Sequence, residues 1–188
     1  MRLTGGEARG RRLKAPRGRL IRPTSDRVRK ALFDVLGGRV AGALFLDAYA
    51  GTGAVGCEAL SRGARRAVFL ERDPQALRLI QQNLQLGSWT DRAEVVEGEV
   101  RVSLRELGRR GERFDIIFLD PPYDNRGLPD DLRLTAGLVL PGGAIVVEHR
   151  STERIEAPEL DSPLTHRSYR HGDSTLSVWR TPEALRRA

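Results

Sequence analysis

From residue 43 onward the chain alternates short apolar runs with segments of helical periodicity, and this alternation limits the possible folds more than any other feature. The apolar runs are typical of buried strands and lie at 44–47, 67–70, 94–96, 115–119 and 144–148. Helical patterns separate them at 55–61, 74–86, 102–107 and 130–139. Strands that alternate with helices predict a parallel sheet with helices on both faces. We therefore expect an α/β fold.

The N-terminal part of the chain lacks this alternation. Residues 1–23 hold glycines and prolines between short mixed runs, which predicts a small hairpin or a loosely ordered arm. A helix is predicted at 25–37, where Thr24 or Ser25 can cap its start. We therefore divide the chain into an N-terminal arm, 1–23, and a main domain, 24–188.

Composition excludes several classes of protein. The 188 residues suffice for one domain with a small appendage. No apolar stretch approaches about 18 residues and the N-terminus lacks the apolar region of a signal peptide, so we expect no contact with a membrane. The single cysteine, Cys57, excludes an internal disulfide, fits a reducing cytoplasm, and is predicted to be a small buried apolar residue. It and three scattered histidines lack ligand spacing, so we expect no structural metal.

Positive charge is concentrated at the N-terminus. Residues 1–30 hold eleven basic and two acidic residues, a balance of +9; because the whole chain carries +7, the remaining 158 residues sum to −2. All basic residues except Lys14 and Lys30 are arginines, which bind phosphates through two nitrogens and stack on bases. A GC-rich or thermophilic genome would also favour arginine, but it would not segregate the charge. The arm is therefore suited to nucleic acid.

A glycine-rich loop follows the first predicted strand and precedes a helix. Gly51, Gly53 and Gly56 fit the G-x-G-x-x-G pattern, which lets a ligand with an adenosine group approach the backbone closely. The pattern alone does not distinguish a dinucleotide from S-adenosylmethionine. Asp47 lies four residues before the first glycine, where its carboxylate could meet the amino group of a methionyl moiety. This acidic residue favours S-adenosylmethionine.

Two more acidic residues follow predicted strands. Glu71 lies 18 residues beyond Gly53, close to the spacing of about 20 at which a carboxylate accepts hydrogen bonds from ribose hydroxyls. Glu99 follows the third strand and could accept a hydrogen bond from the amino group of adenine. The alternatives are an ordinary charge at a strand end for Glu71 and a carboxylate at a helix start for Glu99.

The fourth predicted strand ends in an Asp-Pro-Pro-Tyr sequence. The carboxylate of Asp120 and the carbonyl of Pro121 can both accept hydrogen bonds from one planar amino group. Pro121 and Pro122 supply no backbone N–H and stiffen the loop, while Tyr123 offers a flat face for a base. The alternative is a strand end with a proline-rich turn and no binding role.

In this order the motifs resemble the Rossmann-like class of S-adenosylmethionine-dependent methyltransferases, and within it the bacterial RsmD-type family. The resembling stretches lie at 2–11, 22–29, 46–63, 114–123 and 169–178. The resemblance implies a seven-stranded sheet whose last strand is antiparallel, which agrees with the β-hairpin predicted from 162–170 and 175–180. It further implies methyl transfer from S-adenosylmethionine to N2 of a guanine in 16S ribosomal RNA.

The resemblance and the motifs together define the candidate residues. The candidates for holding the target base are Asp120, Pro121, Pro122 and Tyr123. Those for cofactor binding are Asp47, Ala48, Gly51, Thr52, Gly53, Glu71, Arg72 and Glu99. Those for RNA binding are Arg2, Arg9, Arg11, Arg12, Lys14, Arg22 and Arg27. One departure is Gly98-Glu99-Val100, where relatives usually have aspartate followed by alanine.

Other functions use parts of the same pattern. Methylation of adenine N6 or cytosine N4 in DNA needs the same amine-holding site, but only seven residues separate Tyr123 from Asp131, which leaves no obvious target-recognition insertion. A glutamine methyltransferase typically has asparagine in place of Asp120. A non-catalytic RNA-binding protein on this scaffold would not need Asp47 or Glu71 intact. We expect a cytoplasmic monomer that acts on 16S ribosomal RNA, the small subunit or its assembly intermediate.

Overall fold

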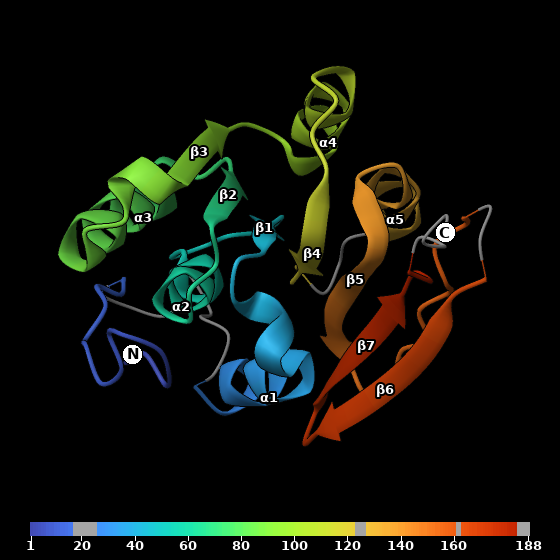
Figure 1. The fold of residues 1–188 in the computed structure, drawn as a ribbon, viewed down its shortest axis with the longest axis horizontal. Coiled ribbons are helices and arrows are strands. Elements are labelled where there is room, and N and C mark those ends of the chain that lie inside the picture. The colour runs from blue at the N-terminus through green and yellow to red at the C-terminus, as the bar shows by residue number, and fades with distance from the viewer. Residues whose placement is uncertain (17–25, 123–126, 161–162, 184–188) are drawn as a thin grey trace, which may run out of the picture.

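The computed structural model describes residues 1–16, 26–122, 127–160 and 163–183, and contains one seven-stranded sheet in the order β3-β2-β1-β4-β5-β7-β6 (Figure 1). Five strands are parallel: β1 (Leu44–Asp47), β2 (Arg66–Glu71), β3 (Ala93–Glu97), β4 (Phe114–Leu119) and β5 (Val139–Arg150). β7 (Ser174–Arg180) lies antiparallel between β5 and the outer strand β6 (Thr165–His171). The predicted sheet and its antiparallel last strand are confirmed.

Helices cover both faces of the sheet. One buried cluster contains apolar side chains of α1 (Asp26–Leu36), α2 (Ala54–Ser61) and α3 (Pro74–Gly87). A second cluster contains those of α4 (Val100–Arg109) and α5 (Leu128–Ala136) on the other face. Short 3₁₀ helices lie at Gly37–Val40 and Thr90–Arg92. No helix among the described residues is long and apolar enough to cross a membrane.

Local sequence explains most element boundaries. α3 begins where Asp73 accepts hydrogen bonds from the N–H groups of Gln75 and Ala76, with a proline in the first turn. α2 is buried along its whole length, in agreement with its small and apolar residues, and Cys57 within it is fully buried as predicted. The residues proposed to cap α1, Thr24 and Ser25, lie outside the described residues.

One predicted helix is wrong at both ends. The pattern indicated a helix at 130–139, whereas α5 spans Leu128–Ala136 and Val139 already belongs to β5, paired with Phe114. The helix starts earlier because Pro129 in the first turn needs no hydrogen-bonded N–H. It ends earlier because the carbonyl of Leu138 accepts a hydrogen bond from the N–H of Phe114 at 2.8 Å. The last apolar residues of the predicted helix therefore belong to the sheet, although their spacing fits a helix.

The described part of the arm is a hairpin packed on the domain. Arg2 and Arg12 pair as an antiparallel bridge, and Leu3, Ala8 and Leu13 are buried in the same cluster as α1, α2 and α3. The arm therefore shares a core with the domain, so the loosely ordered alternative is wrong for residues 1–16. Figure 1 shows this hairpin beside α1 and α2.

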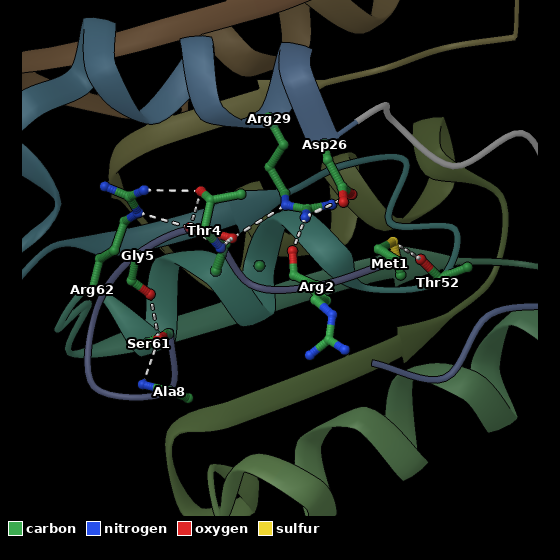
Figure 2. A network of polar contacts seen from close by, with 12 residues as sticks. Met1, Arg2, Thr4, Gly5, Ala8, Asp26, Arg29, Thr52, Ser61 and Arg62 are labelled. Atoms are coloured by element: carbon green, nitrogen blue, oxygen red, sulfur yellow. Dashed lines mark hydrogen bonds and ion pairs between the residues drawn. The ribbon is translucent and has the colours of Figure 1, made fainter. Parts of the chain in front are cut away.

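A buried carboxylate holds the hairpin to α1 and α2. Figure 2 labels three of its partners, Thr4, Arg29 and Arg62. Glu58 on α2 accepts hydrogen bonds from the N–H and hydroxyl of Thr4, the latter at 2.7 Å. It also pairs with Arg29 of α1 at 3.2 Å and with Arg62 at 3.0 Å. Arg29 in turn donates to the carbonyl of Arg2. Because Glu58 and Arg29 are both fully buried, their pairing depends on the hairpin remaining in place.

Candidate cofactor and substrate site

Three acidic residues converge at the carboxyl edge of the parallel strands. Asp47 ends β1, Glu71 ends β2 and Asp120 directly follows β4, and these strands are neighbours in the order β2-β1-β4. The loop after β1 is tied to β4 because the N–H of Ala48 donates to the carbonyl of Phe118 at 2.9 Å. Ligands of open α/β sheets bind at this edge. The sheet therefore brings the predicted cofactor and base-holding carboxylates into one site.

Asp47 is a buried carboxyl group whose pKa is strongly shifted. Burial, with a smaller contribution from the negative charges of Asp120 and Glu71, raises its pKa from an ordinary value of 3.8 to about 7. The N–H of Gly56 donates to its Oδ2 at 2.9 Å, which opposes the rise. The charges of Asp120 and Glu71 thus act on Asp47 across the site. A positive charge bound beside Asp47 would restore its ionised form.

The three glycines of the loop have three different roles. Gly51 has φ +52°, and a Cβ placed there would meet nothing within 4 Å, so the loop is open on that side. Gly53 has φ +74° and precedes α2, a conformation that other residues rarely adopt. A Cβ at Gly56 would lie 2.2 Å from the ring of Phe69 in β2, so only glycine allows α2 to pack this closely. The open side at Gly51 leaves room for a ligand against the backbone.

Glu71 braces the glycine loop. Its Oε2 accepts a hydrogen bond from the N–H of Gly51 at 2.7 Å, and its Oε1 accepts from the N–H groups of Arg72 and Asp73, each at 2.8 Å. These three donors fix the orientation of the carboxylate at the end of β2. Because Oε1 already accepts two hydrogen bonds, only Oε2 retains a further lone pair for a ligand hydroxyl.

Arg72 and Glu99 form an ion pair at the rim of the site. Both side chains are mostly exposed, and the carboxylate of Glu99 makes no capping hydrogen bond to α4. Glu99 is nevertheless the N-cap residue of α4, so the alternative of a carboxylate at a helix start agrees with its position. The N–H of Gly98 donates to the carbonyl of Glu71 at 2.9 Å, which holds this rim next to the end of β2.

The predicted base-holding residues lie at the end of β4. Asp120 is half-buried, Pro121 is buried and Pro122 is exposed. Tyr123 lies outside the described residues. Asp120 thus lies between the interior, where its charge acts on Asp47, and the open face of the loop.

The predicted RNA-binding residues lie mostly on the hairpin and the start of α1. All of those on the described part of the arm are exposed, as is Arg27. Two are partly engaged within the molecule, because Arg2 donates to the carbonyl of Gly10 at 2.8 Å and Arg11 donates to the carbonyl of Leu86. Arg22 lies outside the described residues.

Sequence reasoning missed two residues that support the site. Asn83 is fully buried on α3; its Oδ1 accepts from the N–H of Lys14 at 2.7 Å, and its amide nitrogen donates to the carbonyl of Thr52 at 2.9 Å. Tyr49 donates to Asp131 of α5 at 2.6 Å and so connects the loop after β1 to the opposite helix layer. Of these two residues, only Asn83 could have been found from the sequence, because it is a polar residue on the apolar face of a predicted helix.

The strand order, the antiparallel β7 and a glycine-rich loop after β1 define the class I methyltransferases, whose cofactor is S-adenosylmethionine. A structure of this fold, an O-methyltransferase from Bacillus cereus solved in complex with SAH, has a TM-score of 0.66 at 19% identity, and the match covers 84% of this chain and 82% of that one. The chain belongs to the family described as "Conserved hypothetical protein 95", whose model matches residues 1–180.

Named relatives cover most of the chain. "Putative rRNA methyltransferase YlbH" of Bacillus subtilis is 37% identical over 166 residues, which are 87% of this chain and 89% of that protein. "Ribosomal RNA small subunit methyltransferase D" of Escherichia coli is 38% identical over 135 residues, 70% of this chain and 64% of that protein. The solved structure of "Putative methyltransferase yhhF" from Escherichia coli has a TM-score of 0.83 and 30% identity, with 98% and 99% of the two chains covered.

Proposed function

We propose that this methyltransferase transfers a methyl group from S-adenosylmethionine to the exocyclic N2 of a guanine in 16S ribosomal RNA. The observation that carries the proposal is the position of Asp120 and Pro121 at the end of β4, at the same sheet edge as Asp47 and the glycine loop. The residues to which we assign the target amino group thus lie beside a loop suited to the methyl donor. The names of the two relatives, which are those of ribosomal RNA methyltransferases, support the substrate class.

The residues around the glycine loop fit S-adenosylmethionine. When bound, this cofactor supplies a methyl group activated by a sulfonium charge. We assign the ionised carboxylate of Asp47 to the amino group of the methionyl part and that of Glu71 to the ribose hydroxyls. The open side of Gly51 leaves room for the ligand along the backbone. We assign Glu99, with Arg72 as its partner, to the amino group of adenine.

The substrate amine needs alignment more than it needs a base. The lone pair of guanine N2 is delocalised into the ring, which makes this nitrogen a poor nucleophile. Hydrogen bonds from its two N–H groups to the Asp120 carboxylate and the Pro121 carbonyl would favour a tetrahedral nitrogen and direct its lone pair out of the base plane. Because the proton is acidic only after the new N–C bond forms, Asp120 or water can accept it. The site therefore requires no histidine base.

Recognition of the RNA is assigned to the basic hairpin and the start of α1. Five cations stand exposed on the described part of the arm: Arg2, Arg9, Arg11, Arg12 and Lys14. Arginine pairs with phosphate oxygens through two nitrogens, and each such contact displaces counterions. The proposed substrate is the small ribosomal subunit, its assembly intermediate or its free 16S RNA, bound by one protein molecule in the cytoplasm.

Mass spectrometry of ribosomal RNA from a strain of the source organism that lacks the gene tests this function. We expect the 16S RNA to lose one N2-methylguanosine, while the 23S RNA is unchanged. The wild-type gene should restore the modification and an Asp120→Ala variant should not. An unchanged set of 16S modifications, or loss of a methylated adenine or cytosine instead, would contradict the proposal.

A further inference from the structure

A second surface feature lies apart from the site described above. A groove of about 450 Å³ runs between α1 and the outer strand β6. Its size falls in the range of about 300–1,000 Å³ that is usual for ligand sites. The side chains that matter for its chemistry are Asp34 and Val35 of α1, Arg167, Tyr169 and His171 of β6, and Arg180 at the end of β7. The resemblance to known methyltransferases implies no role for the residues that line this groove.

The alternation of β6 directs one set of side chains into the groove. Side chains two residues apart share a face of a strand, so Arg167, Tyr169 and His171 lie on the same side. Tyr169 pairs with Leu176 and packs against the cluster that contains α1, which identifies this side as the one facing α1. β6 pairs with a neighbour only along β7 among the described residues. The groove is therefore open to solvent along the outer edge of the sheet.

The charge of the groove is positive and uncompensated. Arg180 donates to the carbonyl of Val35 at 3.1 Å, its Nε is buried without a partner, and it has no ion pair in the described part of the chain. Arg167 is exposed and likewise has no ion pair there. The one acid in the lining, Asp34, is already neutralised by Lys30 at 3.0 Å. Two arginine charges thus remain available to an anionic partner.

The His171 end of the groove lies toward the catalytic edge, whereas Arg180, paired with Ala144, lies toward the opposite edge of the sheet. β4 ends at Leu119, which pairs with Val147, and three residues further along β5 Arg150 pairs with Ser174 at the start of β7. The β6–β7 turn therefore lies at the same edge as Asp120. α1 lies between this hairpin and the basic arm in Figure 1, and it contacts both, through Arg29 to Arg2 and through Val35 to Arg180.

We propose that the groove between α1 and β6 binds the RNA phosphate backbone on the side of the catalytic edge opposite to the arm. The proposal rests on the proposed function, because it assumes an RNA substrate. Phosphate is favoured as the occupant since the two arginines lack acidic partners, and guanidinium groups match phosphate oxygens. A target base held at Asp120 would then have backbone contacts on both flanks: the arm on one and the groove on the other.

Arg167→Ala is the test, with Arg167→Lys as a charge-retaining variant and Arg105→Ala as a matched control. Arg105 is exposed on α4, on the opposite face of the sheet, and also has no ion pair among the described residues. The affinity of each protein for naked 16S RNA and for small subunits is measured against salt concentration. Removing one phosphate contact should flatten the slope of log K against log salt by about 0.7–0.9, which corresponds to about four- to sixfold weaker binding at 0.15 M salt.

The outcomes separate this proposal from the proposed function. Support requires a flatter slope on both RNA substrates for Arg167→Ala, near-normal slopes for Arg167→Lys and Arg105→Ala, and unchanged S-adenosylmethionine affinity. An unchanged slope for Arg167→Ala, in a preparation whose wild type methylates guanine, overturns the groove and leaves the function intact. Weakening on small subunits alone would mean that the groove meets a ribosomal protein, which also overturns it. A wild type that neither binds nor methylates RNA would refute both.

Discussion

Replacing Asp47 with asparagine should make the ligand-free protein more stable at alkaline pH, relative to wild type, than at acidic pH. Burial and the charges of Asp120 and Glu71 raise the pKa of Asp47 from 3.8 to about 7. The folded protein therefore holds a proton that the unfolded chain releases. Stability from this group is lost as pH rises from about 4 to about 7 and changes little above that, because both states are then ionised.

The size of the effect follows from the two pKa values. One pKa unit corresponds to about 1.4 kcal/mol, so the shift destabilises the folded state by about 1.7 kcal/mol at pH 5 and about 4 kcal/mol at pH 8. The free energy of unfolding of Asp47→Asn minus that of wild type should thus rise by about 2–3 kcal/mol between these pH values. Asparagine keeps an oxygen that can accept the N–H of Gly56, so the helix start should persist.

Urea unfolding at pH 5 and pH 8 measures this difference. Asp91→Asn serves as the control, because it makes the same chemical change at an exposed position outside the site. Addition of S-adenosylmethionine should stabilise wild type more than Asp47→Asn at pH 8, since the variant lacks the carboxylate proposed to meet the amino group. Parallel pH profiles for wild type and Asp47→Asn would refute the reasoning, because they would mean that Asp47 is ionised without penalty.

Three further substitutions test the site and its support. Asp120→Ala should leave the Kd for S-adenosylmethionine nearly unchanged while methyl transfer falls by about 10²–10³, measured as kcat with 16S RNA; near-wild-type turnover would remove Asp120 from the mechanism. Glu71→Ala should weaken cofactor binding by about 1.5–3 kcal/mol in a calorimetric titration, because a charged acceptor is lost, and an unchanged Kd would make Glu71 only a brace for Gly51. Glu58→Gln should destabilise the protein by about 3–5 kcal/mol, because the buried Arg29 would lose its buried ion pair and keep only the one with the exposed Asp26, whereas Glu106→Gln, at an exposed pair, should change stability by less than about 1 kcal/mol. Equal unfolding midpoints for these last two variants would show that the buried pair does not hold the arm.

The sequence predicted the sheet and the convergence of the acidic residues because both depend on local patterns. A strand followed by a glycine loop fixes where a carboxylate such as Asp47 must lie, and the positions of Glu71 and Asp120 follow from the order of parallel strands. The end of α5 could not be predicted in this way, because the partner of Leu138, the N–H of Phe114, comes from a different strand.

Long-range polar contacts also lay beyond the sequence. Glu58 is an ordinary charged residue within a helical pattern, yet its partners lie 54 positions away at Thr4 and 29 positions away at Arg29. The packing of the arm against the domain could not be predicted from the sequence for a related reason. Leu3 and Leu13 are separated by charged residues, and only the hairpin brings them to one buried side. Charge indicated an arm for nucleic acid, but not an arm that is part of the core.

Transfer of an isotopically labelled methyl group by the purified protein is the most direct test of the proposed methylation of guanine N2. Small subunits and free 16S RNA, each lacking the modification, are incubated with labelled S-adenosylmethionine, and the nucleosides are resolved by liquid chromatography and mass spectrometry. We expect label in N2-methylguanosine from a single 16S position with wild type, and its near-absence with Asp120→Ala. Label on adenine N6 or cytosine N4, or equal labelling by wild type and Asp120→Ala, would contradict it.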